Sequence, residues 1–470
     1  MTFLAVVDAD RIQDYIFAPR QLKLIRGASA IQRDLNLIHL LELLRNSDYG
    51  PGNLAPDGKI RDVSLDHNPS QKWEVVYAGG GNVYTLFRDE SDATRFASAA
   101  CALYRQYGIS ASATGAVVPW DETFGKTLHN AQDAVMTRKT SASAPAGSVA
   151  SPYWKICEAC GAAPAAHWAR NPVTGEQILC SACRARRAHS ERAPYLDQIP
   201  GGLLPPHDFE VIAANARPDN YLALVYLDVD KLGRFFENID PLPPETYRKH
   251  SLHIRDSVEE GVLAGCRAAS VATPAGSSAP FEILLLGGDD AIIMLTAQAV
   301  FAFLRQFREV FREMLPCLSF SAGVVWAHHH LPIAQYVHHA KSLLRSAKAE
   351  GGGRIDYLVV SESMVRGLED RSTERTLRPY SLEDFASLSD TIRNWKQADF
   401  PSNKVHQLYP LAFEGEDQGT LDFLYWISRL KPHHHAAACG FFKQGLWQRQ
   451  PRHATGAADL AELWDFVEGT

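Results

Sequence analysis

Two stretches decide the predicted fold: YLALVYLDVDKLGRFF (residues 221–236) and ILLLGGDDAIIML (residues 283–295). The first begins as an apolar run typical of a β-strand, passes through Asp228 and Asp230, and continues as the start of a helix. The second has two apolar runs around the turn Gly287-Gly288-Asp289-Asp290. Two apolar runs around a glycine-rich turn predict a β-hairpin.

The same plan occurs nearer the amino terminus. Residues 3–17 (FLAVVDADRIQDYIF) repeat the strand, the Asp-x-Asp pair and the helix start, and residues 75–87 (VVYAGGGNVYTLF) repeat the hairpin. In both halves a strand-like run and then a helical run follow, at 109–120 and 129–139, and at 318–328 and 336–354. Because order and spacing are kept, we predict two copies of one α+β unit, each a sheet with helices on one face.

Four cysteines between the copies, Cys157, Cys160, Cys180 and Cys183, have the spacing C-x2-C-x19-C-x2-C. Such a double pair is the signature of a four-thiolate zinc site, since each pair offers two sulfurs from one tight turn. Four sulfur ligands leave no open coordination position, so we predict a structural Zn²⁺. A redox dithiol or two coincidental pairs are the alternatives.

Linkers rich in small residues and proline flank the cysteine segment. We therefore expect the first copy at residues 1–145, the cysteine segment with its linker at 146–205, and the second copy at 206–372. The last part, 373–470, is rich in Trp, Phe and Leu at helical spacing and predicts a helical domain.

The overall charge does not indicate nucleic-acid binding, because 47 Lys and Arg stand against 54 Asp and Glu, a net −7. A local cluster, Arg184, Arg186, Arg187 and Arg192, is compatible with an RNA or partner contact and equally with a solvated helix face. No run approaches the ~18 apolar residues of a membrane helix, and the amino terminus has no signal-peptide pattern. We expect a soluble, cytoplasmic protein.

The turn Gly287–Asp290 is the strongest functional signal. Its glycines leave the backbone open to a phosphate or ribose, and its two carboxylates are expected near Asp228 on the adjoining strand. Carboxylates suit Mg²⁺ or Mn²⁺, which activate a hydroxyl for attack on a phosphate. Lys348 and Arg354, around a Gly-rich loop, offer cations for a triphosphate.

Each of these signals has a plainer interpretation. A GGDD tetrapeptide alone is more often a polar hairpin turn, and Lys348 and Arg354 alone would be solvated surface charges. Asp8 and Asp10 of the first copy, at a strand end, are favoured as helix caps. The combination of all these signals on one strand–helix–hairpin frame favours a catalytic site in the second copy.

The frame resembles the palm domain of GGDEF-type nucleotide cyclases and, more closely, the large subunit of type III CRISPR effector complexes. The resemblance extends over nearly the whole chain and implies two ferredoxin-like palm domains, an intervening zinc ribbon and a carboxyl-terminal helical domain. In the second copy it rests on residues 226–236 (YLDVDKLGRFF), 284–295 (LLLGGDDAIIML), 321–326 (SAGVVW) and 340–354 (AKSLLRSAKAEGGGR). In the first copy it rests on residues 12–17 (IQDYIF), 24–29 (LIRGAS) and 77–84 (YAGGGNVY).

That family converts ATP into cyclic oligoadenylate messengers, so the resemblance implies a nucleotidyltransferase with ATP as its substrate. By position, Mg²⁺ or Mn²⁺ would be held by Asp228, Asp289, Asp290 and the Val229 carbonyl. The nucleotide would be bound by Gly287, Gly288, Lys348 and Arg354. The first palm has GGGN in place of GGDD, and it would face the second palm as a pseudo-dimer and hold the acceptor nucleotide near Ser29, Gly80 and Asn82.

The resemblance also implies partners, namely guide and target RNA and other effector subunits. Many relatives carry an HD nuclease domain before the first palm; since the first strand here begins at Phe3, we expect that domain to be lacking. Two alternatives stay open. One is a non-enzymatic scaffold that binds RNA or protein partners, and the other is a cyclic dinucleotide synthase with a different base preference.

Overall fold

The computed structural model describes residues 1–46, 48–141, 153–171, 175–192, 195–360, 376–443, 447–448 and 454–469. Contacts divide the chain into two compact units. The first unit comprises Met1–Ile199, Lys231–Glu260 and Ile283–Ala291, and the second comprises Pro200–Asp230, Gly261–Glu282 and Ile292–Thr470. The tip of the GGDD hairpin therefore belongs to the same compact unit as the first palm. The four domain boundaries drawn from the sequence stay predictions.

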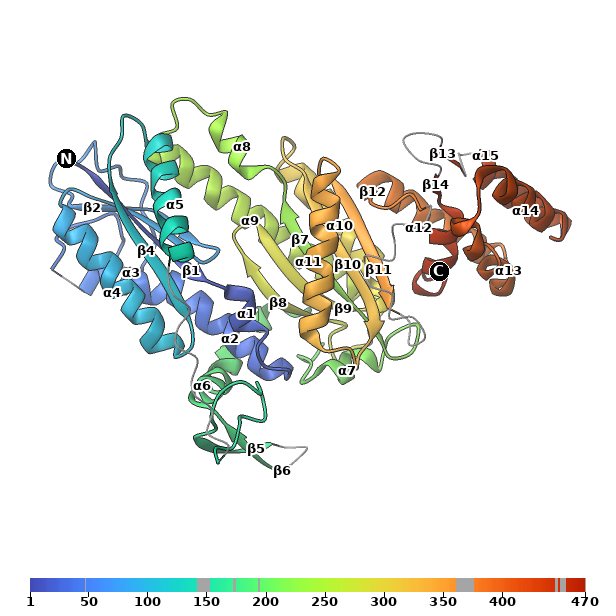
Figure 1. The fold of residues 1–470 in the computed structure, drawn as a ribbon, viewed down its shortest axis with the longest axis horizontal. Helices are drawn as coiled ribbons and strands as arrows, with labels where there is room; N and C mark the ends of the chain where they lie inside the picture. The colour runs from blue at the N-terminus through green and yellow to red at the C-terminus, as the bar shows by residue number, and fades with distance from the viewer. Residues whose placement is uncertain are drawn as a thin grey trace. The chain divides into compact units, whose positions relative to one another are not determined.

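The first palm is built on a four-stranded antiparallel sheet (Figure 1). Its strands are β1 (Phe3–Asp10), β2 (Trp73–Gly79), β3 (Asn82–Phe87) and β4 (Ser112–Pro119), in the order β2-β3-β1-β4. The register sets Asp8 opposite Asn82 on β3 and opposite Thr114 on β4. The predicted hairpin and the strand after it are confirmed.

Helices cover both faces of this sheet, so the expectation of helices on one face is wrong. Ala116 belongs to the core shared with α5 (Phe124–Ser141), whereas a methyl group added at Gly115 would lie 3.3 Å from Ala97 Cβ on α4 (Glu90–Gly108). Consecutive strand residues point to opposite faces, which sets α4 and α5 on opposite sides. The remaining helices of this palm are α1 (Ile12–Ile16), α2 (Leu22–Asp34), a π-helical turn (Leu35–His39) and α3 (Leu40–Asn46).

The second palm repeats the strand order of the first. Its strands β7 (Tyr221–Val229), β8 (Phe281–Gly287), β9 (Asp290–Thr296) and β10 (Phe320–His328) lie in the order β10-β7-β9-β8, and β11 (Arg354–Val360) and β12 (Tyr380–Ser381) extend the sheet beyond β10. In both sheets the first strand of the unit lies between the third and the fourth. The shared order confirms the duplicated ferredoxin-like fold.

Close helix packing also covers both faces of the second sheet. On β10, the Phe320 ring lies 4.7 Å from that of Phe307 on α10 (Val300–Met314), while a methyl group at Gly323 would approach the Ala340 carbonyl oxygen of α11 (Ile333–Ala349) to 2.1 Å. Residues 320 and 323 point to opposite faces. The other helices here are α7 (Phe209–Ala213), α8 (Leu232–Glu237) and α9 (Pro244–Ala269).

The cysteine segment forms a small ribbon, and the carboxyl-terminal part is helical, as predicted. The ribbon has β5 (His167–Asn171) and β6 (Gly175–Leu179), followed by α6 (Ser181–His189). In the helical part, Trp395 stacks on Phe400 with ring centroids 4.3 Å apart. Its elements are α12 (Leu382–Gln397), α13 (Ser402–His406), α14 (Glu416–Ser428), α15 (Pro432–Lys443), β13 (Trp447–Gln448), β14 (Ala454–Thr455) and α16 (Ala457–Leu463).

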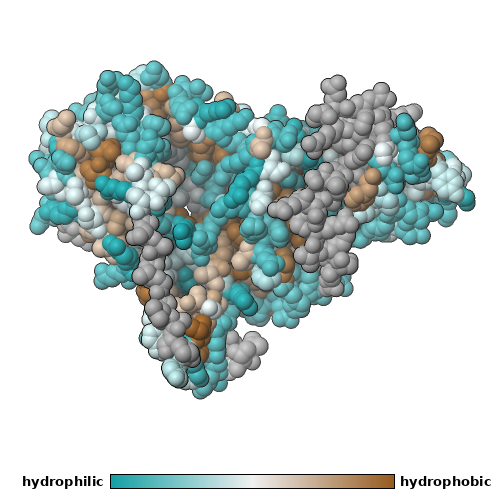
Figure 2. Space-filling model, viewed as in Figure 1, coloured by the Kyte–Doolittle hydropathy of each residue, from teal (hydrophilic) through white to brown (hydrophobic). Residues whose placement is uncertain are grey.

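Hydropathy of the folded chain agrees with the absence of long apolar runs in the sequence. Among the described residues, no helix has both the length and the apolar character that crossing a membrane requires. The face drawn in Figure 2 is mostly hydrophilic, with smaller apolar patches interrupted by polar residues.

A buried ion pair joins the first sheet to α9. Arg248 Nη2 lies 2.6 Å from Glu74 Oε1, and the two side chains are 2% and 0% exposed. Arg248 Nη1 also donates to the Val75 carbonyl at 3.1 Å, and the Leu65 N–H donates to the second Glu74 oxygen at 2.6 Å. Two desolvated charges are tolerable only with such partners. The pair therefore fixes β2 and the beginning of α9 to each other.

Glu74→Gln tests this pair, because it leaves the buried Arg248 guanidinium with only the more distant and half-exposed Asp62 carboxylate (3.9 Å) as a counter-charge. We expect the free energy of unfolding to fall by about 3–5 kcal/mol, measured by chemical denaturation. The matched control is Lys249→Met, which removes an exposed ion pair with Asp62 (3.0 Å). This variant should change the free energy of unfolding by less than about 0.5 kcal/mol. Equal losses of unfolding free energy in the two variants would contradict a stabilising role of the Glu74–Arg248 pair.

Candidate functional site

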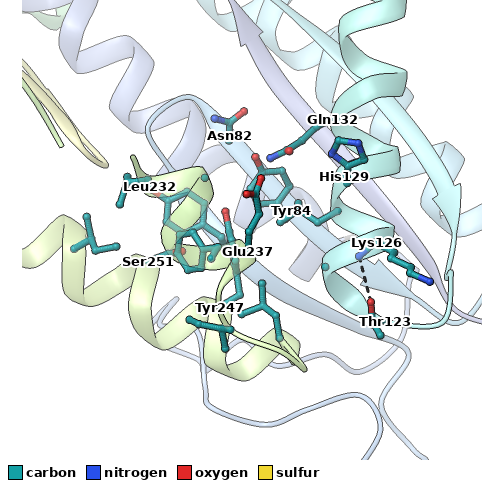
Figure 3. Close-up of a pocket in the computed structure, with 18 of the residues that line it drawn as sticks. Asn82, Tyr84, Thr123, Lys126, His129, Gln132, Leu232, Glu237, Tyr247 and Ser251 are labelled. Atoms are coloured by element: carbon teal, nitrogen blue, oxygen red, sulfur yellow. Dashed lines mark hydrogen bonds between the residues drawn. The ribbon is translucent and has the colours of Figure 1, made fainter. Parts of the chain in front are cut away.

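A cavity of ≈ 830 Å³ lies in the first unit, walled by both palms. The first palm contributes its turn (Gly79, Gly80 and Asn82) and α5, and the second contributes α8, the beginning of α9, and Gly288 and Asp289 of the GGDD turn. Figure 3 shows Lys126, His129 and Gln132 on α5, across the cavity from Leu232, Glu237, Tyr247 and Ser251. Small-molecule sites typically have volumes of roughly 300–1,000 Å³. The cavity is therefore large enough for a nucleotide.

The two glycine turns touch at the edge of this cavity. A methyl group added at Gly80 would lie 3.6 Å from both the Gly287 carbonyl oxygen and the Gly288 Cα, and one added at Gly288 would lie 3.4 Å from the Gly80 Cα. Gly80 and Gly288 have φ of +57° and +70°, a region that favours glycine. Glycine is therefore favoured at both positions by the backbone conformation, and the two turns lie in contact.

Three tyrosines from both palms surround the cavity beside Asp289. The ring centroids of Tyr77, Tyr84 and Tyr247 lie 6.0–6.4 Å apart. Burial raises the pKa of all three hydroxyls, that of Tyr84 to about 12, and the negative charge of Asp289 adds to each increase. The wall beside Asp289 therefore consists of neutral hydroxyls at physiological pH.

In the second palm, Asp228 and the Val229 carbonyl contact the same ammonium group, that of Lys348. Lys348, in the last turn of α11, forms an ion pair with Asp228 Oδ1 and lies 3.5 Å from the Val229 carbonyl oxygen. Asp228 is one residue from the end of β7, and Asp290 is the first residue of β9, its neighbour in the strand order. The structure thus brings together three of the predicted site residues, Asp228, Val229 and Lys348.

Asp230 has a structural role that the sequence did not indicate. It is buried and accepts hydrogen bonds from Ser319 Oγ (2.8 Å), Ser321 Oγ (2.7 Å) and the Gly353 N–H (2.7 Å). A methyl group at Gly352 would approach its carboxylate carbon to 2.7 Å. Asp230 therefore ties the glycine loop before β11 to the end of β7.

The first palm contains a matching arrangement around Lys139. Its Nζ lies 3.0 Å from Asp8 and 3.2 Å from Asp10, and donates to the Ala9 carbonyl at 3.3 Å. The cap position of α1 is Arg11, and no side chain caps that helix. The interpretation of Asp8 and Asp10 as helix caps is therefore wrong, because a lysine at the end of α5 binds both carboxylates.

Other predicted residues lie elsewhere. Arg354 opens β11 and donates to the Glu350 carbonyl at 3.2 Å and the Pro379 carbonyl at 2.8 Å. Ser29 is half-buried on α2 and is not among the described residues that line the cavity, whereas Gly80 and Asn82 are. Gly287 packs against the first-palm turn.

The sequence analysis missed the cavity wall formed by helices. Lys126, His129 and Gln132 are polar residues of an amphipathic helix, a pattern that normally indicates a solvated face. Tyr77 and Tyr84 did carry a signal, because they bracket the GGGN turn in the motif at residues 77–84. Tyr247 belongs to α9 and had none.

The cysteine cluster fits a zinc ion. The four Sγ atoms lie within 4.8 Å of one another, and those of Cys160 and Cys180 are 3.9 Å apart. A tetrahedron with ~2.3 Å Zn–S bonds has sulfurs about 3.8 Å apart. A hydrogen bond from the Cys183 side chain lowers the pKa of Cys180 to about 5, which favours the thiolate that zinc requires. The donor set and spacing of the cluster are thus compatible with a structural zinc ion.

The arginine cluster after these cysteines divides into two roles. Arg186 is buried, donates to the Tyr15 carbonyl at 2.9 Å, and has its guanidinium 4.4 Å from the centroid of the Tyr15 ring. Arg184 and Arg187 instead contact His167 and the Arg170 carbonyl of β5. Arg186 therefore anchors α6 to the first palm, and an RNA or partner contact stays a prediction for the others.

Comparison with known proteins agrees with this geometry. Residues 221–355 match the family model of the Cas10/Cmr2 second palm domain. Among solved structures, the chain is similar to the apo Csm1–Csm4 cassette (TM-score 0.62, 16% identity), to the same cassette with cA4 (0.61, 15%) and to that with one ATP (0.60, 16%). Each match covers 99% of this chain and 70% of the other. No curated protein sequence matches the chain.

These observations define a two-palm protein with an intervening zinc ribbon and a helical carboxyl-terminal part. Its residues 221–355 match the model of the Cas10/Cmr2 second palm domain, and its fold is similar to that of a chain of the Csm1–Csm4 cassette. At 15–16% identity the solved structures establish the fold alone.

Zinc removal provides a test of the ribbon. We expect the wild-type protein to contain bound zinc and Cys180→Ser to lose it, with faster hydrogen exchange in α6, because metal ligation is coupled to folding of such segments. Zinc content is measured by elemental analysis. Cys317→Ser, at an exposed cysteine outside the cluster, is the control and should retain the metal. Full zinc content in Cys180→Ser would refute the four-thiolate assignment.

Proposed function

We propose that the chain is a divalent-metal-dependent nucleotidyltransferase that joins and cyclises ATP into cyclic oligoadenylates. The observation that carries the proposal is the position of Asp289, a GGDD carboxylate, in the wall of a nucleotide-sized cavity that both palms enclose. Support also comes from the family match over residues 221–355 and from similar folds solved with ATP and with cA4.

The donor set of the second palm suits a hard cation. Asp228, Asp289, Asp290 and the Val229 carbonyl offer oxygen ligands only, as Mg²⁺ and Mn²⁺ prefer. When bound, the metal would supply Lewis-acid activation of the α-phosphate and of the attacking 3′-hydroxyl. Gly287 and Gly288 leave room for the donor phosphates at the turn.

Lys348 and Arg354 supply positive charge in this proposal. The Lys348 ammonium forms an ion pair with Asp228, a carboxylate that would hold the metal, and it would have to leave Asp228 to contact the donor phosphates. Arg354 starts from backbone carbonyl contacts and would turn from them to the triphosphate.

The acceptor nucleotide would occupy the cavity on the side of the first palm. Gly80 and Asn82 are at its edge, and Lys126 and His129 on α5 offer donors to a phosphate tail. The GGGN turn carries no carboxylate, so the first palm would bind a nucleotide without metal catalysis of its own.

The carboxylates of the turn are the first test. Asp289→Ala with Asp290→Ala should abolish oligonucleotide products from ATP with Mg²⁺ or Mn²⁺, with a thermal midpoint close to wild type, since neither side chain belongs to the core. Products are identified by mass spectrometry with and without effector subunits and guide and target RNA. The control, Asp57→Ala with Asp66→Ala, changes two exposed loop carboxylates. Product formation by the Asp289/Asp290 double variant would refute the metal assignment.

Lys348→Ala tests whether a cation that contacts the substrate phosphates contributes to catalysis apart from metal binding. We expect kcat/KM for ATP to fall by ~10- to ~100-fold, because a positioned cation that contacts phosphates is lost. Lys341→Ala, seven residues earlier on the exposed side of α11, should stay within about twofold of wild type. Similar losses in both variants would indicate a general charge effect instead of a site contact.

Competition among the four nucleoside triphosphates separates this proposal from a cyclase with another base preference. Incorporation of adenine alone supports it, and guanine-containing products favour the alternative. Nucleotide binding with no turnover in the presence of partner subunits and RNA would favour a scaffold that binds partners, such as a Csm4-like subunit.

A further inference from the structure

We infer that the first palm positions the catalytic turn of the second, with Tyr77 as the positioning residue. The inference rests on the proposed function and adds a role to a palm without turn carboxylates. Residues 283–291, the tip of the GGDD hairpin, belong to the same compact unit as the first palm.

The supporting contact is between backbones. Gly80 lies against Gly287 and Gly288 at distances where one added methyl group would be in van der Waals contact, 3.6 Å from each nearest atom. A larger side chain at position 80 would displace the GGDD turn or the first-palm turn. Glycine at this second turn position, which both palms share, thus lets the two turns touch.

Tyr77 fixes the turns relative to each other. Its hydroxyl oxygen would lie 2.9, 3.7 and 3.2 Å from methyl groups added at Gly79, Gly80 and Gly288, so it lies beside both turns at once. The side chain is 8% exposed and its ring contacts those of Tyr84 and Tyr247. A hydroxyl held this rigidly next to Gly288 constrains where Asp289 points.

The geometry explains why the contact matters for chemistry. Asp289 must place its oxygens to within a fraction of an ångström for metal-assisted transfer, and a 1 Å misplacement can cost about 100-fold in rate. A hairpin tip with two glycines is intrinsically flexible. Contact with the first palm restricts the conformations that the two glycines of the tip would otherwise allow.

Tyr77→Phe removes only the hydroxyl and retains the ring contacts. We expect kcat for nucleotide joining to fall ~10- to ~100-fold, with KM for ATP within about twofold, because the turn and not substrate binding is affected. The matched control is Tyr104→Phe, another buried tyrosine of the first palm, whose hydroxyl donates to Asn36 Oδ1 (2.7 Å) away from both turns. Its kcat should stay within about twofold of wild type.

A second pair of variants tests the backbone contact. Gly80→Ala adds a methyl group against the GGDD turn, whereas Gly58→Ala adds one where nothing lies within 4 Å, and both glycines have positive φ (+57° and +86°). A loss of kcat in Gly80→Ala with Gly58→Ala unaffected supports the inference. Equal effects in the two variants, or an unchanged kcat in both Tyr77→Phe and Gly80→Ala, would overturn it.

Failure of the proposed function is recognised separately, by wild-type protein that makes no product under any condition. The positioning role is then measured by Mn²⁺ affinity in the presence of AMPPNP, followed by electron paramagnetic resonance. Weaker Mn²⁺ binding in Tyr77→Phe than in Tyr104→Phe supports the inference without turnover, and equal affinities overturn it.

Discussion

The buried pair between Glu74 and Arg248 is the constraint on which the candidate site depends. Both charges are withdrawn from water, so each requires the other, and the pair fixes β2 of the first palm to the beginning of α9 of the second. Tyr247, the preceding residue, is thereby held against Tyr77 and Tyr84. The wall of the cavity beside Asp289 therefore has a fixed geometry, because an ion pair sets the position of α9 against the first sheet.

Duplication explains why two palms with different chemistry retain one plan. Asp8, the Ala9 carbonyl and Lys139 correspond in position to Asp228, the Val229 carbonyl and Lys348. Thr114 donates to Asp10 as Ser321 donates to Asp230, at equivalent places in the two registers. The lysine was therefore part of the shared unit, and the palms differ chiefly in the residues of the hairpin turn.

The fold could be predicted from sequence because its signals are local and repeated. Apolar runs of strand length, two glycine turns and the double cysteine pair each determine structure within a few residues, and duplication makes each half a check on the other. The covering of both sheet faces was missed because amphipathic helices do not reveal which face they pack on. The cavity wall on α5, and the binding of Asp8 and Asp10 by Lys139 some 130 residues away, depend on tertiary packing that no local pattern encodes.

Glycine in the first-palm turn illustrates how lost catalytic residues can still be constrained. If GGGN were only a remnant, any small polar turn would serve, since a hairpin tolerates Asn or Asp at such positions. Gly80 instead has positive φ and abuts Gly288, and Tyr77 lies over both turns. A side chain at Gly81 would require an unfavourable positive φ (+87°) and a shift of the Ile12 side chain, because a methyl group there approaches Ile12 Cδ1 to 2.2 Å. The turn of the first palm is therefore constrained both by its own backbone conformation and by its contact with the GGDD turn.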